Sequence, residues 1–486
     1  MVILPHPDDL INMKKVLLLF LLILSFTFVF VSCSGNIDSS DDESTVIQTD
    51  TNPETKDDYS DPELDDSSSP SESGYETTAP APFPKTDSDV AYEASPSIEG
   101  IVGEMGDGYI GGPKATNGDS SGQEVTIEPG QLTSSVLYDH DKYDSFLKLL
   151  RSGQTEEENG AFYEYQKLHN LTLNRITLHL NSPNLKVSLL DDDGNALWTS
   201  VSDKNGTCYL FTEELSDTYS VKVSNDYIDG LVFTVSDGYN ISCGFTRQSK
   251  NKLQLMFVID TTGSMMDELS YLKSEISDVI SKVSNNGQID VSLSLLFYRD
   301  AGDEYVTLFE DFTDDIQKMQ SFISKQSAAG GGDFEEAIQE AMKVALDASW
   351  DDTDVTKILI HVADAPSHSK DVASWFESVK SFSEKGIRIV TVASSGIDRL
   401  TEFLYRAECI QTNGYYGFLT NHSGIGGDHL DPTIDEELPV EYLNDMLVRI
   451  INGIFSGEMA EPSPIQTSQI QEVQNQGDTE PVPSID

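Results

Sequence analysis

The sequence predicts an α/β fold with a doubly wound, mostly parallel sheet in the C-terminal half of the chain. Apolar runs that suit strands buried on both faces occur at Leu253–Ile259, Lys357–Ala363 and Ile387–Ala393. Stretches with apolar residues at helical spacing separate these runs. Strands that alternate with helices form parallel sheets covered by helices on both faces. We therefore predict a Rossmann-like domain over residues 250–456.

The other elements of this domain follow from their own patterns. Met265–Val283 carries one apolar helix face, Ile289–Tyr298 alternates like a strand, and Tyr305–Phe309 reads as a short edge strand. Further predicted elements are helices at Asp314–Ile323, from the glycine-rich loop Ala328–Glu336 to Ala348, from Val372, from Arg399 and at Val440–Phe455, with a strand at Tyr415–Leu419.

Two smaller regions are predicted before it. Residues 126–168 are expected to be helical, because Ser135–Leu150 has apolar residues at helical spacing. From Leu171 the apolar residues alternate, and turns with Asp-Gly and Asn-Gly predict a small antiparallel β-sandwich over residues 169–248. This stretch is similar to bacterial carboxypeptidase-regulatory-like modules, a resemblance that implies spacing and support. Its acidic turn Asp191–Asn195 could bind calcium, but it lacks the distant glutamate of an EF-hand loop, so we favour a solvated turn.

Charge and composition exclude one class of partner and define two flexible segments. Asp and Glu outnumber Lys and Arg by 83 to 30, which gives a net charge of −53 and argues against nucleic acid as a partner. Residues 34–125 are rich in Ser, Asp, Glu, Pro and Thr, so we predict a disordered acidic linker there. The polar tail 457–486 is predicted to be disordered as well.

The N-terminus reads as an export signal. Met13-Lys14-Lys15 and the apolar run Val16–Val31 are typical of a signal peptide over residues 1–33. The run ends in Phe30-Val31-Ser32-Cys33, which resembles the lipobox of bacterial lipoproteins and implies lipidation of Cys33. An uncleaved membrane anchor is the alternative, although the run is short for a spanning helix. We expect an exported protein that is lipid-anchored at the bacterial cell envelope.

Three further cysteines fit no zinc pattern. Cys208 and Cys243 fall in the predicted sandwich, where they could pair after export or remain buried thiols. Cys409 is expected to be a core residue.

Oxygen-bearing side chains follow the predicted strands. Asp260, Thr262 and Ser264 come directly after the first buried strand, and Asp364 follows the strand Lys357–Ala363. In parallel sheets ligands gather at the carboxyl ends of the strands. Carboxylates and hydroxyls are the hard donors that Mg²⁺ and Mn²⁺ prefer. The alternative for such residues in front of a helix is N-capping.

With these loops placed, residues Lys252–Phe455 resemble the von Willebrand factor A family, above all in FVIDTTGSM. The resemblance implies a metal-ion-dependent adhesion site, with Asp260, Thr262 and Ser264 matching its first motif and Asp364 its last. In the middle motif Gly332 stands where the family has Thr. Asp333 is the nearest oxygen donor, and it could bind the ion or cap the next helix, with Glu336 completing a capping box. We expect Mg²⁺ as the cofactor, with Mn²⁺ as the alternative.

Three functions are compatible with these features. The leading one is metal-dependent binding of an unidentified protein or extracellular ligand. If Asp333 bound the ion, three carboxylates would surround it, and the attraction between the ion and an acidic ligand would be weaker. An envelope hydrolase is the second: Thr262 replaces the second Asp of DxDxT phosphotransferases, and His361, His368 and Asp364 come without a GxSxG nucleophile. We therefore expect no enzyme. A structural envelope protein without metal is the third.

Overall fold

The structure, a computed structural model, describes residues 127–151, 161–225, 228–285, 289–351 and 354–465. The predicted signal peptide with Cys33 and the linker 34–125 lie outside the described residues. No helix among the described residues is both long enough and apolar enough to span a membrane.

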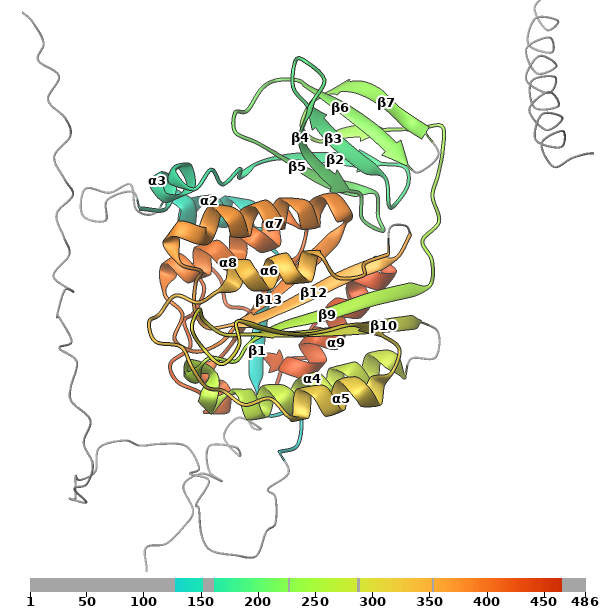
Figure 1. The fold of residues 1–486 in the computed structure, drawn as a ribbon. Coiled ribbons are helices and arrows are strands. Elements are labelled where there is room, and N and C mark those ends of the chain that lie inside the picture. Colours follow the sequence, from blue (N-terminus) through green and yellow to red (C-terminus); the bar gives the residue numbers. More distant parts are fainter. Residues whose placement is uncertain (1–126, 152–160, 226–227, 286–288, 352–353, 466–486) are drawn as a thin grey trace, which may run out of the picture. The chain divides into compact units, whose positions relative to one another are not determined.

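An eight-stranded sheet forms the centre of the α/β domain (Figure 1). The four pairings that involve the middle strands are parallel, and the outer strands at both edges are antiparallel. This confirms the predicted largely parallel sheet. In sheet order the strands are β11 (Thr307–Thr313), β10 (Asp290–Tyr298), β9 (Lys252–Asp260), β12 (Thr356–Ala363), β13 (Ile387–Ala393), β14 (Tyr415–Leu419), β1 (Thr133–Leu137) and β15 (Glu441–Tyr442).

Helices cover both faces of this sheet because its central strands are apolar on both sides. In β9, Leu255 and Phe257 belong to one hydrophobic core and Met256 and Val258 to the other. This is the two-residue period of a strand. On one face lie α4 (Leu269–Ser284), α5 (Ile316–Ser324) and α9 (Leu443–Ser456), and on the other α6 (Ile338–Leu346), α7 (Val372–Lys385) and α8 (Arg399–Gln411).

The helix predicted over Ser135–Leu150 is correct only in its second half. Residues Thr133–Leu137 form β1, which pairs antiparallel with both β14 and β15. The helical spacing holds for α2 (Tyr143–Arg151), where Phe146 stacks on Phe403 of α8. A second helix, α3 (Ala161–Leu168), follows. The main sheet therefore takes a strand from the region that we predicted to be helical and separate.

Seven strands between β1 and β9 form two smaller sheets. One has the order β5-β2-β8 and the other β4-β3-β6-β7, and the pairing of β2 with β8 is parallel, unlike the purely antiparallel prediction. At the predicted acidic turn, Asp191 Oδ1 accepts the N–H of Asn195 at 2.7 Å and Oδ2 accepts its side-chain amide at 3.0 Å, so the turn satisfies its own carboxylate. The strands are β2 (Asn174–Leu180), β3 (Lys186–Leu190), β4 (Ala196–Val201), β5 (Thr207–Thr212), β6 (Tyr219–Asn225), β7 (Ile228–Val235) and β8 (Tyr239–Ile241).

The smaller sheets contact the α/β domain through α7 and the start of β13. The hydroxyls of Ser200 and Ser383 lie 2.6 Å apart, and Lys186 pairs with Glu384 at 3.2 Å. Cys208 and Cys243 are separate buried thiols, so the alternative of a disulfide between them is not realised. Cys409 is buried in the core, as predicted.

The tail is ordered at its beginning, contrary to the prediction for residues 457–486. Ser463 N–H donates to Glu441 Oε1 at 2.7 Å, and Ile465 N–H donates to Val440 O at 2.9 Å. These bonds fasten the tail beside β15. Residues 466–486 lie outside the described part.

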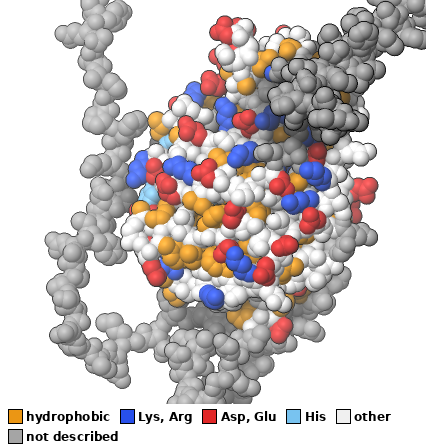
Figure 2. Space-filling view, turned by 45° about the vertical axis from the view of Figure 1, so that its right-hand side comes forward, with side chains coloured by type: hydrophobic (Ala, Val, Ile, Leu, Met, Phe, Trp, Pro, Cys, Tyr) orange, Lys and Arg blue, Asp and Glu red, His pale blue; other side chains and the backbone are white. Residues whose placement is uncertain are grey.

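Figure 2 shows a surface on which acidic, basic and apolar side chains are interspersed.

Candidate metal centre

The residues of the first and last predicted motifs meet at the carboxyl edge of the sheet. Strands β9 and β12 are parallel neighbours, with Val362 opposite Ile259. The next residues along the two strands are Ala363 and Asp260, and Asp364 follows directly. Two loops that are a hundred residues apart in the sequence therefore begin side by side.

Hydrogen bonds connect four side chains in a row. Asp260 Oδ1 accepts from the backbone N–H and from the hydroxyl of Thr262, each at 2.8 Å. The hydroxyls of Thr262 and Ser264 lie 3.0 Å apart, and Ser264 in turn hydrogen-bonds to the carboxylate of Asp364. Thr262 precedes a 3₁₀ turn, Gly263–Asp267, but its side chain makes no cap bond. The two hydroxyls thus face the carboxylates rather than capping the turn.

Two carboxylate oxygens of this row have no hydrogen-bond partner. Asp260 is fully buried, and Asp364 is 4% exposed, yet Asp260 Oδ2 and Asp364 Oδ1 are both unpaired. Burial raises the pKa of Asp260, and burial together with the charge of Asp260 raises the pKa of Asp364. Unpaired buried carboxylate oxygens are costly, and a divalent cation relieves that cost. The donors present therefore fit Mg²⁺ or Mn²⁺.

Asp333 belongs to a different grouping. Its carboxylate lies with Asp300 and His368, where one ligand atom from each is within 4.8 Å of the others. Asp300 Oδ1 and His368 Nε2 are 2.9 Å apart. Among the described residues, Asp333 shares no hydrogen bond with the row from Asp260 to Asp364.

The predicted capping role of Asp333 is wrong. Helix α6 begins at Ile338, its N-cap position is Ala337, and no side chain caps it. The first turn thus starts five residues beyond Asp333. A capping box of Asp333 with Glu336 is therefore not formed.

Glu336 is the residue that sequence reasoning assigned only to this capping box. Its side chain is 2% exposed, and its Oε2 is unpaired. Burial raises its pKa to about 9, helped by the charges of Asp260, Asp300 and Asp364. Because residues 331–337 are not helical, no periodicity in the sequence could have indicated that this glutamate is buried.

A buried polar layer lies behind Asp260. His361 Nδ1 is 2.8 Å from Glu408 Oε1, and Tyr298 Oη is 3.3 Å from His361 Nε2. Trp375 of α7 donates its indole N–H to Glu408 Oε2 at 3.1 Å. His361 is thus a core residue that pairs with Glu408, and it faces no solvent.

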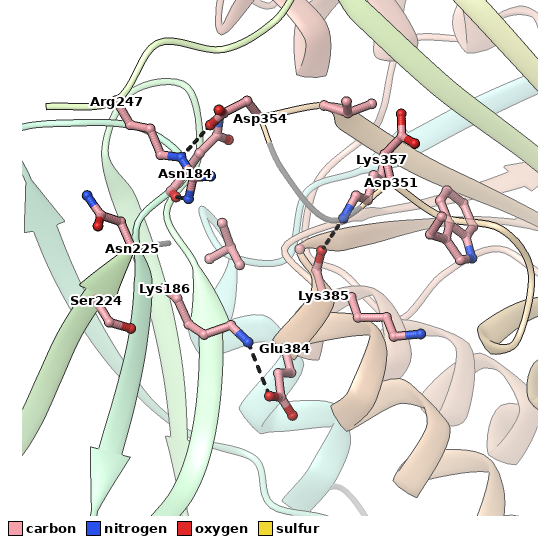
Figure 3. Close-up of a pocket in the computed structure, with 14 residues that line it drawn as sticks. Asn184, Lys186, Ser224, Asn225, Arg247, Asp351, Asp354, Lys357, Glu384 and Lys385 are labelled. Atoms are coloured by element: carbon pink, nitrogen blue, oxygen red, sulfur yellow. Dashed lines mark hydrogen bonds and ion pairs between the residues drawn. The ribbon is translucent and has the colours of Figure 1, made fainter. Parts of the chain in front are cut away.

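A cavity of about 330 Å³ lies at the opposite end of the sheet (Figure 3). Its lining includes Lys357 at the start of β12 and Gly386 just before β13, whereas the carboxylate row follows the strand ends. Among its lining residues, Lys186 pairs with Glu384 and Arg247 pairs with Asp354. This cavity is separate from the candidate metal centre.

Comparison with known proteins bears on this edge of the sheet. The family model of the von Willebrand factor A domain matches residues 254–424, which include Asp260, Thr262, Ser264 and Asp364. Residues 254–424 are a von Willebrand factor A (VWA) domain. Such domains are usually binding modules, and they often hold a divalent cation.

Individual relatives resemble only parts of this chain. An ariadne-like RING finger protein of Acanthamoeba polyphaga mimivirus is 32% identical over 121 residues, which cover 25% of this chain and 12% of that protein. An alpha-protein kinase of Dictyostelium discoideum is 25% identical over 170 residues. These residues cover 34% of this chain and 25% of that protein. The chain thus spans a quarter or less of the length of these relatives.

Among solved structures, a conserved hypothetical protein BatB from Bacteroides thetaiotaomicron is similar with 14% identity and a TM-score of 0.30. The match covers 42% of this chain and 98% of that one.

Proposed function

We propose that this protein is an exported lipoprotein whose VWA domain binds a partner protein or an extracellular ligand through a divalent cation. Asp260, Thr262, Ser264 and Asp364 would hold the ion. The unpaired, buried oxygens of Asp260 and Asp364 carry this proposal. When bound, the cation supplies positive charge and an open coordination position at the end of the sheet.

The surface around the site supports binding of a protein partner. Met266 follows Ser264 closely and is 67% exposed, and Phe334 follows Asp333 and is 44% exposed. The loops that carry them touch, since Gly263 N–H donates to Gly330 O at 3.1 Å. Exposed apolar side chains beside a polar centre are typical of interaction surfaces.

We propose binding rather than catalysis at this site. His361, which acts electrostatically on Asp260, is fully buried and paired with Glu408, so it cannot exchange protons with a bound ligand. Metal-dependent turnover of generic phosphoesters or acyl esters that disappears in Asp260→Asn would contradict this part of the proposal.

Titration calorimetry of the purified full chain with Mg²⁺ and Mn²⁺ tests the metal site. We expect one ion per chain, and in Asp260→Asn an affinity lower by at least about tenfold, since loss of even an outer-shell group costs about 10–100-fold. Asp314→Asn changes an exposed carboxylate on another part of the domain and should leave the affinity unchanged. Asp333→Asn should have a smaller effect than Asp260→Asn. Equal binding by the wild type and Asp260→Asn would contradict the site.

The anchor is proposed from the sequence around Cys33 and needs its own test. In a bacterial host we expect the wild-type chain in the membrane fraction and Cys33→Ser in the soluble exported fraction. Ser34→Ala is the matched control and should behave as the wild type. Membrane retention of Cys33→Ser would favour the uncleaved anchor instead.

A further inference from the structure

The row from Asp260 to Asp364 lacks a donor from the glycine-rich loop. Gly332 occupies the position that the sequence aligns with a threonine, and it has no side chain to contribute. Asp333 is exposed and lies with Asp300 and His368. Two acidic side chains of this loop remain, Glu335 and Glu336, and of these Glu336 is buried.

The backbone holds Glu336 against the loop that follows β12. Its N–H donates to Pro366 O at 2.9 Å, and it forms a bridge with Ser367. Pro366 and Ser367 follow Asp364 by two and three residues. Glu336 is therefore fixed to the loop that presents Asp364, whatever its side chain does.

Gly331 shows where the Glu336 carboxylate reaches. A Cβ placed on Gly331 would lie 3.0 Å from Glu336 Oε1 and 3.4 Å from the Cβ of Thr262. Because both atoms are that close to one point, they are at most 6.4 Å apart. Ligand oxygens on opposite sides of a Mg²⁺ ion are separated by about 4 Å, since each bond is about 2.1 Å long. This bound places the Glu336 carboxylate beside the Thr262 side chain, and a change of the glutamate's rotamer would bring it to the span that a shared ion requires.

We propose that Glu336 is a direct ligand of the cation, which supplies the donor that Gly332 lacks, and that the site consequently favours a partner's neutral oxygen over a carboxylate. This inference rests on the metal site proposed above. The buried and unpaired Oε2 of Glu336 would gain the ion as its partner, as would those of Asp260 and Asp364.

The preference for a neutral ligand follows from the charge. Asp260, Asp364 and Glu336 together bring three negative charges to an ion with two positive charges. A carboxylate from a partner would approach a centre with net negative charge in a buried environment, where repulsion is weakly screened. An amide or hydroxyl oxygen carries no net charge and meets no such repulsion.

Binding of Mn²⁺ to the full chain tests Glu336 as a ligand. We expect the affinity of Glu336→Gln to be lower than that of the wild type by at least about tenfold. Glu336→Asp keeps the charge but shortens the side chain, so it should also lose affinity. Glu335→Gln, the matched control at the adjacent position, should bind as the wild type does. Wild-type affinity in Glu336→Gln would overturn the inference, whereas absence of Mn²⁺ binding by the wild type would overturn the metal site itself.

Thermal unfolding separates a ligand from a purely structural glutamate. In EDTA, Glu336→Gln should melt at a higher temperature than the wild type, because it removes a buried acidic group whose ionised form is disfavoured by burial and by the charges of Asp260 and Asp364. With saturating Mg²⁺ the melting temperature of the wild type should rise more than that of the variant. An equal gain from Mg²⁺ in both proteins would contradict a ligand role, even if Glu336→Gln changed stability.

Water relaxation by bound Mn²⁺ tests the preferred ligand, with acetate and acetamide as probes. In the wild type we expect acetate to displace bound water no better than acetamide does. In Glu336→Thr, which restores a hydroxyl and removes the charge, acetate should become the better probe by several-fold. Strong displacement by acetate in the wild type would overturn the proposed preference.

Discussion

Gly331 combines two constraints that can be separated by mutation. Its φ of +70° favours glycine, and a Cβ there would crowd Glu336 and Thr262. Gly424 has a similar φ of +65° with no atom within 4 Å of a Cβ. We expect both alanine variants to lose about 1–2 kcal/mol of unfolding free energy from the backbone alone. Only Gly331→Ala should also weaken Mn²⁺ binding, and equal metal affinity in the two variants would show that the crowding is harmless.

The raised pKa of Glu336 predicts how stability depends on pH. The folded chain holds this proton up to about pH 9, whereas an ordinary glutamate releases it near 4.5. The stabilisation is therefore complete below about pH 4.5 and is lost as the pH rises to about 9. Without metal we expect the melting temperature to fall by at least about 4 °C between about pH 5 and about pH 9, since about 1 kcal/mol corresponds to about 2–4 °C. Calorimetry with saturating Mg²⁺ should show this fall reduced, and an unchanged slope would refute the assignment.

At the scale of residues, the sequence predicts the part of the site that strands define. Asp260 and Asp364 each end an apolar strand, and the common edge of a parallel sheet brings such residues together. The glycine-rich loop lies between α5 and α6, so no strand of the sheet fixes its position. Its course depends on contacts with the loops after β9, β10 and β12, such as Gly331 N–H donating to Asp303 Oδ2 at 2.9 Å. The positions of Asp333 and Glu336 therefore could not be read from spacing.

At the scale of elements, β1 shows the same limit. Five strands of the sheet, β9, β10, β12, β13 and β14, begin and end within one residue of their predicted bounds, because their apolar runs are distinct. The five residues of β1 precede α2, and the helical spacing of the apolar residues in α2 extends back over them. Their partners Leu419 and Glu441 lie about 300 residues away, beyond the reach of any local pattern.

The segment after β1 is fixed to α8 by buried charges, which predicts a large effect of mutation. Arg406 donates to both Asp139 oxygens, at 3.0 and 2.6 Å, and to Glu402 at 2.8 Å. Arg406→Met would leave these buried carboxylates without their cation, at a cost of about 3–5 kcal/mol. Lys148→Met on α2 removes an exposed ion pair with Asp435, so it should change the free energy of unfolding little. Urea unfolding measures both, and similar midpoints for the two variants would contradict the role of this cluster.

For the whole molecule, the contribution of β1 means that residues 250–456 do not contain the complete sheet. Glu275 of α4 accepts the N–H groups of Gly130, Gln131 and Leu132, which lead into β1. Without them Glu275 would be buried without donors, and the edge of β14 would be open to other chains. We expect residues 127–465 to melt at a higher temperature than residues 250–456, and the shorter piece to self-associate. Equal melting temperatures and two monomers in light scattering would show that β1 is dispensable.

The wide separation of β1 from its partners also sets the order of events on the ribosome. Ser134 pairs with Leu419, so β1 is synthesised 285 residues before the strand that it joins. Every pairing within the two smaller sheets spans fewer than about 70 residues, and these sheets can close while translation continues. The main sheet cannot be completed at β1 until β14 and β15 have emerged. Until then β1 has no pairing partner, so its edges are open to pairing with other chains.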